Sequence, residues 1–425
     1  MTAALIIMFV VAYAFIALEE PLGINKSAAA LVGAGVLWTV YATASGDPHL
    51  IDKELSTSLV STAQVAFFLI GAMTIVEVID SHDGFEMVTS RLRARSLSSL
   101  AWLIAGASFF LSAVLDNLTT AIIMVSLLRK LVPLREDRMM LAGLVIICAN
   151  AGGAWSPIGD VTTTMLWIGG QVTTAAIITR LFLPSLVNAL VPTLIIVWIF
   201  RGRSFAMAEP APTPSDTSPS EQRLMFALGL GALLAVPVFK TVTHLPPFLG
   251  ILLGLGVVWV VGDLIHRRNP ADDSPRITIA AALTRIDLSA IVFFIGILLA
   301  VATLEHAGVL EGIAQWLDAH IGRLDVIAAL IGLFSAVIDN VPMVAATMGM
   351  FSLDAHPTDS FLWEFLAYCA GTGGSILIIG SAAGVAAMGI ERIGFLWYLR
   401  RFGPMALAGY VAGALVYLAE QPFLH

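Results

Sequence analysis

The stretch SAVLDNLTT at residues 112–120 decides the fold of this chain, because the sequence contains it twice. The second copy, SAVIDNVP, occupies residues 335–342. A Phe-Phe pair precedes each copy, at 67–68 and 293–294, and a Gly-Gly pair follows each. The offset between the copies narrows only from 225 residues (Gly71 to Gly296) to 221 residues (Gly152 to Gly373). Ordered matches at a nearly constant offset predict a protein built from two related halves.

Composition places both halves in a membrane. Of the 425 residues, 58% are apolar and only 12% are charged, and the mean hydropathy is +0.90. A soluble protein carries about 25% charged residues. Stretches long and apolar enough to cross a bilayer recur along the chain, for example 3–18, 60–76, 177–200, 248–262 and 288–303. We therefore predict an all-α, multi-pass membrane protein.

The sequence also argues against a cleaved signal peptide, a nucleic-acid partner, and a disulfide or zinc framework. The stretch Ala3–Leu18 lacks a basic leader and a cleavage site, so we expect a retained first helix. The net charge of -8 argues against nucleic acid as a partner. Cys148 and Cys369 both lie in apolar segments, which disfavours a disulfide framework or a zinc site.

The distribution of basic residues predicts the orientation. Cytoplasmic loops are enriched in Lys and Arg, and an inner-membrane topology that places only Lys53, Arg180, Lys240 and Arg323 outside leaves 18 of the 22 inside. This topology puts both termini outside and the Pro/Ser-rich linker 204–222 in the cytoplasm.

The same topology requires helical hairpins that do not cross the bilayer. Residues 98–131 have inside-type arginines at both ends, and about 34 residues are too few for two spans of ~20. We predict that this segment is a re-entrant hairpin entering from the cytoplasm, and that 325–350 enters from outside. Hairpins that enter from opposite sides make the halves inverted repeats, whose substrate site is typically near the midplane.

The predicted domain organisation follows from these repeats. Residues 1–56 and 223–285 are expected to be scaffold helices, with the linker 204–222 between the halves. Residues 57–203 form the first repeat, with a broken helix at 139–168, and 286–425 form the second, with a broken helix at 361–390. Amphipathic segments at 83–96, 311–322 and 391–401 are expected to lie along the membrane interface and to connect fixed and moving parts.

The Asp-Asn pairs in the two hairpins are the first candidate site. A carboxylate in hydrocarbon costs several kcal/mol, so Asp116 and Asp339 must face protein, water or a cation. An alternative is helix capping, because Asp and Asn favour helix starts. Two copies at equivalent positions favour a shared site, and the two roles can coexist.

The broken helices are the second candidate site. Glycines and Pro157 interrupt the segment 150–164, which frees backbone groups beside Asn150 and Asp160. A packed kink is the alternative. The corresponding segment 371–381 has hydroxyls but no carboxylate.

Oxygen ligands without soft ligands suit a hard cation such as sodium or lithium. A buried carboxylate can hold either a proton or part of a cation site, so competition alone couples the two flows. Further hydroxyls that could contribute are those of Ser112, Thr120, Ser156, Ser335, Thr372, Ser375 and Ser381. A possible proton path consists of Glu77, Asp80, Glu305, His82 and His306, although charges at helix ends are common at interfaces.

The motifs at 112–120, 150–164, 335–342 and 371–384 closely resemble those of the NhaD-type sodium/proton antiporters, over roughly residues 57–400. That family belongs to the ion transporter superfamily. The resemblance implies efflux of sodium or lithium driven by protons, and a dimer in which a transport domain moves against a scaffold like an elevator. It implies no cofactor, since the ions are substrates. The cation-binding positions that it implies are Asp116, Asn117, Thr119, Asn150, Asp160, Thr162, Thr163, Asp339 and Asn340.

Two other functions are weighed against this prediction. A carrier of the same superfamily for arsenite or a di- or tricarboxylate would use the cation only for coupling. The symporter relatives carry Ser-Asn-Thr at the hairpin tips, whereas this chain carries acidic tips, which favours cation exchange. A membrane enzyme or a channel is the second alternative, but the sequence offers neither a nucleophile–base pair nor a continuous pore.

Overall fold

A computed structural model describes residues 1–17, 19–86, 94, 96–203, 218–268, 279–337 and 339–424. These residues are helical or connecting segments, with no strand among them. Nine of the described helices are long and apolar enough to cross a membrane. The predicted all-α, multi-pass fold class is confirmed.

The helices of the first half are α1 (Thr2–Ala17), α2 (Glu19–Leu22), α3 (Lys26–Ser45), α4 (Pro48–Ser81), α6 (Leu97–Leu115), α7 (Asn117–Leu131), α8 (Arg135–Ala154), α9 (Val161–Ile168) and α10 (Thr174–Ile199). The remaining helices are α11 (Pro219–Thr243), α12 (Pro247–Arg268), α13 (Ile279–Arg285), α14 (Leu288–His306), α15 (Val309–His320), α16 (Leu324–Phe334), α17 (Asn340–Met350), α18 (Phe361–Gly373), the short 3-10 helix η1 (Ile378–Gly380), α19 (Ala382–Glu391), α20 (Phe395–Arg401) and α21 (Gly403–Leu424).

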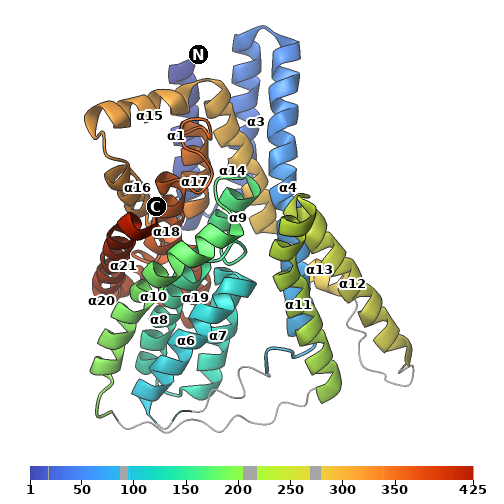
Figure 1. Ribbon diagram of the computed structural model, residues 1–425, viewed down its shortest axis with the longest axis vertical. Helices are drawn as coiled ribbons and strands as arrows, with labels where there is room; N and C mark the ends of the chain where they lie inside the picture. The colour runs from blue at the N-terminus through green and yellow to red at the C-terminus, as the bar shows by residue number, and fades with distance from the viewer. Residues whose placement is uncertain are drawn as a thin grey trace.

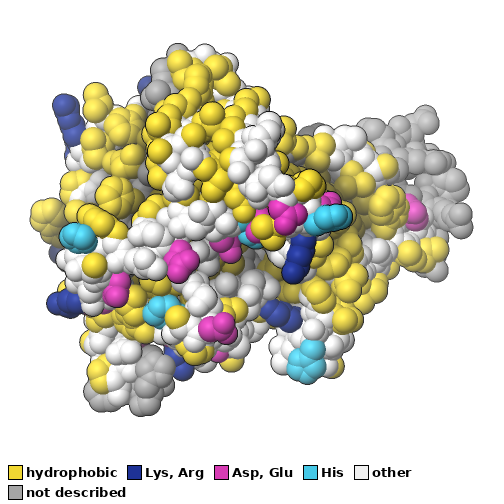
Figure 2. Space-filling view, turned by 90° about the horizontal axis from the view of Figure 1, so that it is seen from above, with side chains coloured by type: hydrophobic (Ala, Val, Ile, Leu, Met, Phe, Trp, Pro, Cys, Tyr) yellow, Lys and Arg dark blue, Asp and Glu magenta, His cyan; other side chains and the backbone are white. Residues whose placement is uncertain are grey.

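The described residues form three hydrophobic cores, the first of which joins α4, α11 and α12 to α16, α18 and α21 and contacts the other two. The second core joins α6, α7 and α8 to α19 and α20, and these helices lie in the lower half of Figure 1. The third core joins α1, α3, α14 and α17 to the middle of α4. Helices α3 and α4 extend to the upper end of the molecule, where α15 crosses it. Seen from above, that end presents Asp, Glu and His side chains bordered by hydrophobic surface (Figure 2).

Both predicted hairpins consist of two helices that meet at the Asp-Asn motif. Helices α6 and α7 meet at Asp116, whose φ of 92° turns the chain sharply. Helices α16 and α17 are separated by residues 335–339. Of the four hairpin helices, only α6 is long and apolar enough to cross a membrane. The re-entrant and inverted entry of the hairpins therefore stays a prediction.

Both predicted broken helices are interrupted in the expected places. Helix α8 begins at Arg135, four residues before the predicted 139, and ends at Ala154, and α9 resumes at Val161. Helix α18 ends at Gly373, and α19 resumes at Ala382 after η1. The break after α8 contains Pro157 and Gly159, and the break after α18 contains Gly374 and Gly380. Gly152, Gly153 and Gly373, which were expected to break the helices, remain helical because they lie in the last turns of α8 and α18.

The two halves make matching contacts at these breaks. A Cβ atom on Gly152 would lie 2.1 Å from the Phe109 carbonyl oxygen, and one on Gly373 would lie 2.0 Å from that of Gly332. Only glycine permits so close an approach of hairpin backbone to broken helix. The hydroxyl of Ser112 donates to the Ala149 carbonyl (2.6 Å), and that of Ser335 donates to the Ala370 carbonyl (3.3 Å). Each hairpin is thus fixed to the broken helix of its own half.

The other predicted segments are described only in part. Helix α15 covers most of the predicted interfacial segment 311–322, although it begins and ends two residues earlier, and α20 lies within 391–401. Most of the predicted segment 83–96 and of the linker 204–222 lies outside the described residues. The division into scaffold and moving domains stays a prediction.

Candidate cation site

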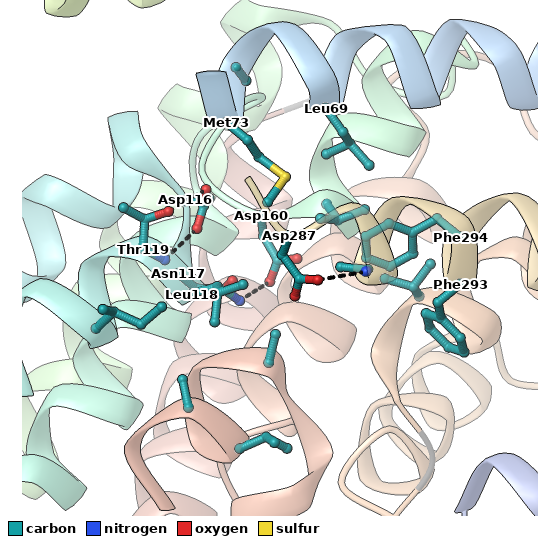
Figure 3. Close-up of a pocket in the computed structure, with 18 of the residues that line it drawn as sticks. Leu69, Met73, Asp116, Asn117, Leu118, Thr119, Asp160, Asp287, Phe293 and Phe294 are labelled. Atoms are coloured by element: carbon teal, nitrogen blue, oxygen red, sulfur yellow. Dashed lines mark hydrogen bonds between the residues drawn. The ribbon is translucent and has the colours of Figure 1, made fainter. Parts of the chain in front are cut away.

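The asparagines of the two hairpin tips converge on one carboxylate, that of Asp160, and Figure 3 shows the contact made by Asn117. The Asn117 amide donates to Asp160 Oδ2 at 2.9 Å, and the Asn340 amide donates to the same oxygen at 3.4 Å. Asn117 also donates to Asn150 Oδ1 at 3.0 Å. Residues from both halves therefore meet at the break of the first broken helix, as the sequence predicted for these four side chains.

The local fold orients the Asp160 carboxylate toward the tips. Asp160 is the N-cap of α9, and its Oδ1 accepts from the backbone N–H of Thr162 at 3.0 Å. The hydroxyl of Thr163 donates to the Asp160 carbonyl at 2.9 Å. With one carboxylate oxygen occupied by the cap, the other faces the hairpins. The side chain is buried, and the helix N-terminus favours its negative charge.

Asn150 is fixed by the second half of the chain. Its amide donates to the hydroxyls of Ser375 and Ser381, each at 2.8 Å. This leaves its carbonyl oxygen to accept from Asn117. The two serines therefore position the amide rather than face the tips with their own lone pairs.

The remaining predicted hydroxyls hold the backbone. Ser156 donates to the Ala113 carbonyl at 2.5 Å, and Thr372 donates to the Tyr368 carbonyl within its own helix at 2.7 Å. In contrast, the buried hydroxyls of Thr120 and Thr162 make no hydrogen bond of ordinary geometry to any described residue. Buried polar atoms left in this way are typical of positions that bind an ion or water.

Asp116 has the capping role that was weighed at the sequence level. Its two carboxylate oxygens accept from the backbone N–H (2.7 Å) and the hydroxyl (3.0 Å) of Thr119. The carboxylate lines the same cavity as Asp160, so the cap and an electrostatic contribution to the site coexist.

Asp339 has a partner that the sequence did not indicate. Its carboxylate caps α17 through the Val341 N–H at 3.4 Å, and its Oδ2 lies 3.6 Å from the ammonium of Lys26. Lys26 is the first residue of α3, whereas the basic-residue pattern predicts only that it lies in a cytoplasmic loop. A lysine at a helix start opposes the helix dipole, and this mismatch was the only signal in the sequence.

A cavity of about 890 Å³ opens beside these groups. Of the described residues that line it, seven are acidic and two are basic: Glu19, Glu77, Asp80, Asp116, Asp160, Asp287 and Asp339, with Lys26 and Arg285. Two of the predicted proton-path acids, Glu77 and Asp80, are thus in the same cavity as the site. Arg285 lies 3.6 Å from Glu77. Asp287 and Glu19 are lining acids that the sequence reasoning missed.

A second cavity, of about 450 Å³, is lined by two more of the predicted proton-path residues, Glu305 and His306. The His306 ring lies 3.0 Å from the Ser58 hydroxyl and 3.9 Å from Glu54. His82 lines neither cavity; its ring lies 3.7 Å from Glu221 and 2.8 Å from the Val78 carbonyl. The five residues therefore belong to three places.

The two cavities are separated by a thin hydrophobic layer. On α17, Val341 lines the first cavity and Ala345 the second, and on α9 the corresponding residues are Val161 and Met165. Each pair is one helical turn apart, about 5.4 Å along the axis. Val341, Ala345 and Met165 belong to one buried cluster. We call these four side chains the seal.

The ligand chemistry of the site is mixed. Within the described part of the chain, no three Asp, Glu, His or Cys side chains converge to hold a metal ion by themselves. Amides, hydroxyls and one carboxylate do converge at Asp160. Such oxygen donors suit a hard monovalent cation, not a transition metal.

Comparisons with known proteins agree with this chemistry. The family described as citrate transporter matches residues 4–371. Sodium/proton antiporters 1 and 2 of Arabidopsis thaliana are 48% and 47% identical, over 98% of this chain and 72% and 99% of their own lengths. The Na(+)/H(+) antiporter NhaD of Vibrio cholerae is 30% identical over 98% of this chain and 91% of its own. The crystal structure of the YdaH transporter of Alcanivorax borkumensis shares the fold, with a TM-score of 0.61 at 14% identity over 94% of this chain and 99% of that one.

Proposed function

The chain belongs to the NhaD-type sodium/proton antiporters within the citrate transporter family, and from this premise we propose that it exchanges sodium for protons at the site around Asp160. One observation supports this location above the others. A single buried carboxylate accepts hydrogen bonds from the tip amides of both halves. A cation or a proton bound there would be held by both hairpins at once.

Competition for Asp160 supplies the coupling. When a proton occupies the carboxylate, its charge is lost and a cation is no longer attracted; when a cation binds, the proton must leave. We expect the side-chain oxygens of Asn117, Asn340 and Thr162, which are buried beside Asp160, to serve as further ligands of the cation. In each half of the transport cycle the site then carries either a proton or a sodium ion, but not both.

The family description raises the possibility of a carboxylate anion as substrate. The charge of the cavity opposes it, because seven acidic side chains face two basic ones along its lining. Lys26 and Arg285 are both engaged by acidic partners, Asp339 and Glu77. A multiply charged anion would meet repulsion here, whereas sodium would be attracted.

Everted membrane vesicles test the proposal. Respiration acidifies their interior, and added sodium should release that pH gradient in vesicles containing this protein, with no such release in vesicles lacking it. The Asp160→Asn variant should insert normally and release nothing, because the amide cannot ionise. Absence of a sodium response in the wild type at every pH from 7 to 9 would reject sodium/proton exchange. A response that required added citrate or arsenite would favour the anion carrier.

Further properties of the same carrier are proposed with it. We expect lithium to replace sodium, because both are hard monovalent cations that oxygen ligands bind. We also propose an inner-membrane location with both termini outside, a homodimer, and an elevator-like movement of the hairpin-containing domain. Lithium-induced release in the vesicles, termini labelled from each side, and crosslinking in the membrane test these points separately.

A further inference from the structure

Lys26 introduces a positive charge at the edge of the cation site. Its ammonium lies 3.6 Å from Asp339 Oδ2 and 4.7 Å from the centre of the Phe293 ring. Its side chain is 29% exposed and that of Asp339 is 21% exposed, and both residues line the main cavity. An incoming cation therefore reaches the same carboxylate that Lys26 already contacts.

The backbone of Lys26 is held firmly in this position. The Ser27 hydroxyl donates to the Ser289 carbonyl at 2.7 Å, which joins the start of α3 to the start of α14. The Lys26 N–H donates to Glu19 at 3.1 Å, and Asn25 caps the helix through the Ser27 N–H at 2.8 Å. The Lys26 backbone is therefore anchored by hydrogen bonds, whereas its flexible side chain can change position by rotation about its own bonds.

The position of the Lys26 ammonium is electrostatically unfavourable for α3, which suggests that the charge has a function. A lysine in the first turn of a helix is repelled by the helix dipole, and an aspartate that already caps α17 needs no ammonium for that purpose. The other titratable residues that line the cavity with the pair include Tyr13, Glu19, Asp160 and Asp287, and the three carboxylates all attract a cation. Of the two basic residues in the described lining, Arg285 contacts Glu77, and Lys26 is the one that contacts Asp339.

We propose that Lys26 is an internal competitor of the transported cation: its ammonium neutralises Asp339 in the empty site and withdraws when sodium binds. The inference rests on the proposed cation exchange. It assigns Lys26 the role of a positioning and affinity-setting residue. The carrier then binds sodium more weakly than its carboxylates alone would allow, which favours release of the ion on the other side.

Removing the charge should therefore tighten sodium binding. Ion pairs as exposed as this one are weak, so we expect Lys26→Gln to lower the half-saturating sodium concentration by about two- to five-fold at one fixed alkaline pH. Choline replaces sodium to keep the ionic strength constant, because salt screens such pairs. Lys26→Arg should retain the wild-type value. Lys53→Gln, which removes an exposed lysine outside both cavities, serves as the matched control.

Chemical restoration of the charge separates electrostatics from packing. Cys148 and Cys369 are fully buried, so a Lys26→Cys variant presents one accessible thiol within the described residues. We expect Lys26→Cys to show the lowered half-saturation. Modification with an aminoethyl thiosulfonate should restore the wild-type value, and the neutral methyl reagent should not. Equal effects of the two reagents would show that volume, not charge, matters.

The outcomes distinguish this inference from the proposed function. Sodium-driven proton movement by the wild type tests the function. With an active wild type, an unchanged or higher half-saturation in Lys26→Gln would overturn the role of Lys26. The sodium concentration that half-maximally raises the melting temperature of the purified protein gives the same comparison from binding alone, so the role of Lys26 is tested even if exchange is not observed.

Discussion

The two hairpin aspartates show how one side chain can serve the fold and the substrate. Asp116 and Asp339 each cap the second helix of a hairpin, yet each also faces the cavity that holds Asp160. Their neighbours Asn117 and Asn340, not the aspartates, donate directly to Asp160. The two residues of each Asp-Asn pair thus have different roles. The aspartate caps the helix and adds negative charge to the cavity, and the asparagine donates a hydrogen bond to Asp160.

The capping and electrostatic roles of Asp116 can be separated by Asp116→Asn. Asparagine caps helices about as well as aspartate, so the free energy of unfolding should change by less than about 0.5 kcal/mol. Loss of the charge should reduce sodium/proton exchange by about tenfold or more, the factor that about 1.4 kcal/mol of lost cation binding produces. Thermal unfolding and exchange in proteoliposomes measure the two effects.

The control for this variant is Asp325→Asn, which removes a carboxylate paired with Arg323 away from both cavities. We expect it to leave exchange near the wild-type rate. If Asp116→Asn also exchanged at that rate, Asp116 would be a helix cap alone.

At the scale of single residues, the repeat predicts which side chains lie near one another. Asn117 and Asn340 occupy equivalent positions in the two halves and both contact Asp160, whose segment has no carboxylate at the corresponding place in the second half. Their role as cation ligands stays a prediction. The contact between Lys26 and Asp339 could not be predicted in this way. It joins α3, which has no counterpart in the repeated motifs, to a hairpin far along the chain, and no spacing rule relates them.

At the scale of helices, the breaks of α8–α9 and α18–α19 depend on close backbone packing. Gly152 and Gly373 approach the carbonyl oxygens of α6 and α16 more closely than any side chain would permit. The sequence showed the glycines and therefore the breaks. It did not show which helix lies against them, because that depends on the tertiary arrangement of the hairpin.

Gly152→Ala tests this packing. The new methyl group would lie 2.1 Å from the Phe109 carbonyl oxygen, so α6 and α8 would have to move apart. We expect the free energy of unfolding to fall by about 1–3 kcal/mol, as in other overpacked cores, and exchange to fall with it. Thermal unfolding of the purified protein measures the loss.

Gly106→Ala is the matched control within α6. A Cβ atom there would meet nothing within 4 Å, so replacing this mid-helix glycine should stabilise the protein by about 0.5–1 kcal/mol. Equal melting temperatures for the two variants would contradict the close packing described for Gly152.

At the scale of the whole molecule, the seal divides the protein into two compartments. The helices α4, α9, α14 and α17 each line the first cavity over one part of their length and the second over another. Composition and the basic-residue pattern predicted a multi-pass protein, but the position of the seal was not predictable. It depends on which residues of these four helices meet in the tertiary packing.

Val341→Ala should weaken the seal. Val341 is 2% exposed and lies between the cavities, and removing two carbon atoms from it opens space for water. We expect proteoliposomes containing this variant to lose an imposed pH gradient faster than wild type when no sodium is present. Val238→Ala, which changes a residue 61% exposed on α11, should behave as wild type. A gradient that persisted as long in Val341→Ala would place the barrier elsewhere.

The thinness of the seal also determines where the membrane voltage acts. If water fills both cavities, the potential falls across about one helical turn, ~5.4 Å, instead of the ~30 Å of the whole hydrocarbon layer. The local electric field is then roughly six times stronger than in the surrounding bilayer. A charge that crosses this turn experiences nearly the full potential, about 2.3 kcal/mol per 100 mV. The short distance between Val341 and Ala345 would thus make each ion crossing a voltage-driven step, although the ion itself moves only a few ångströms relative to the protein.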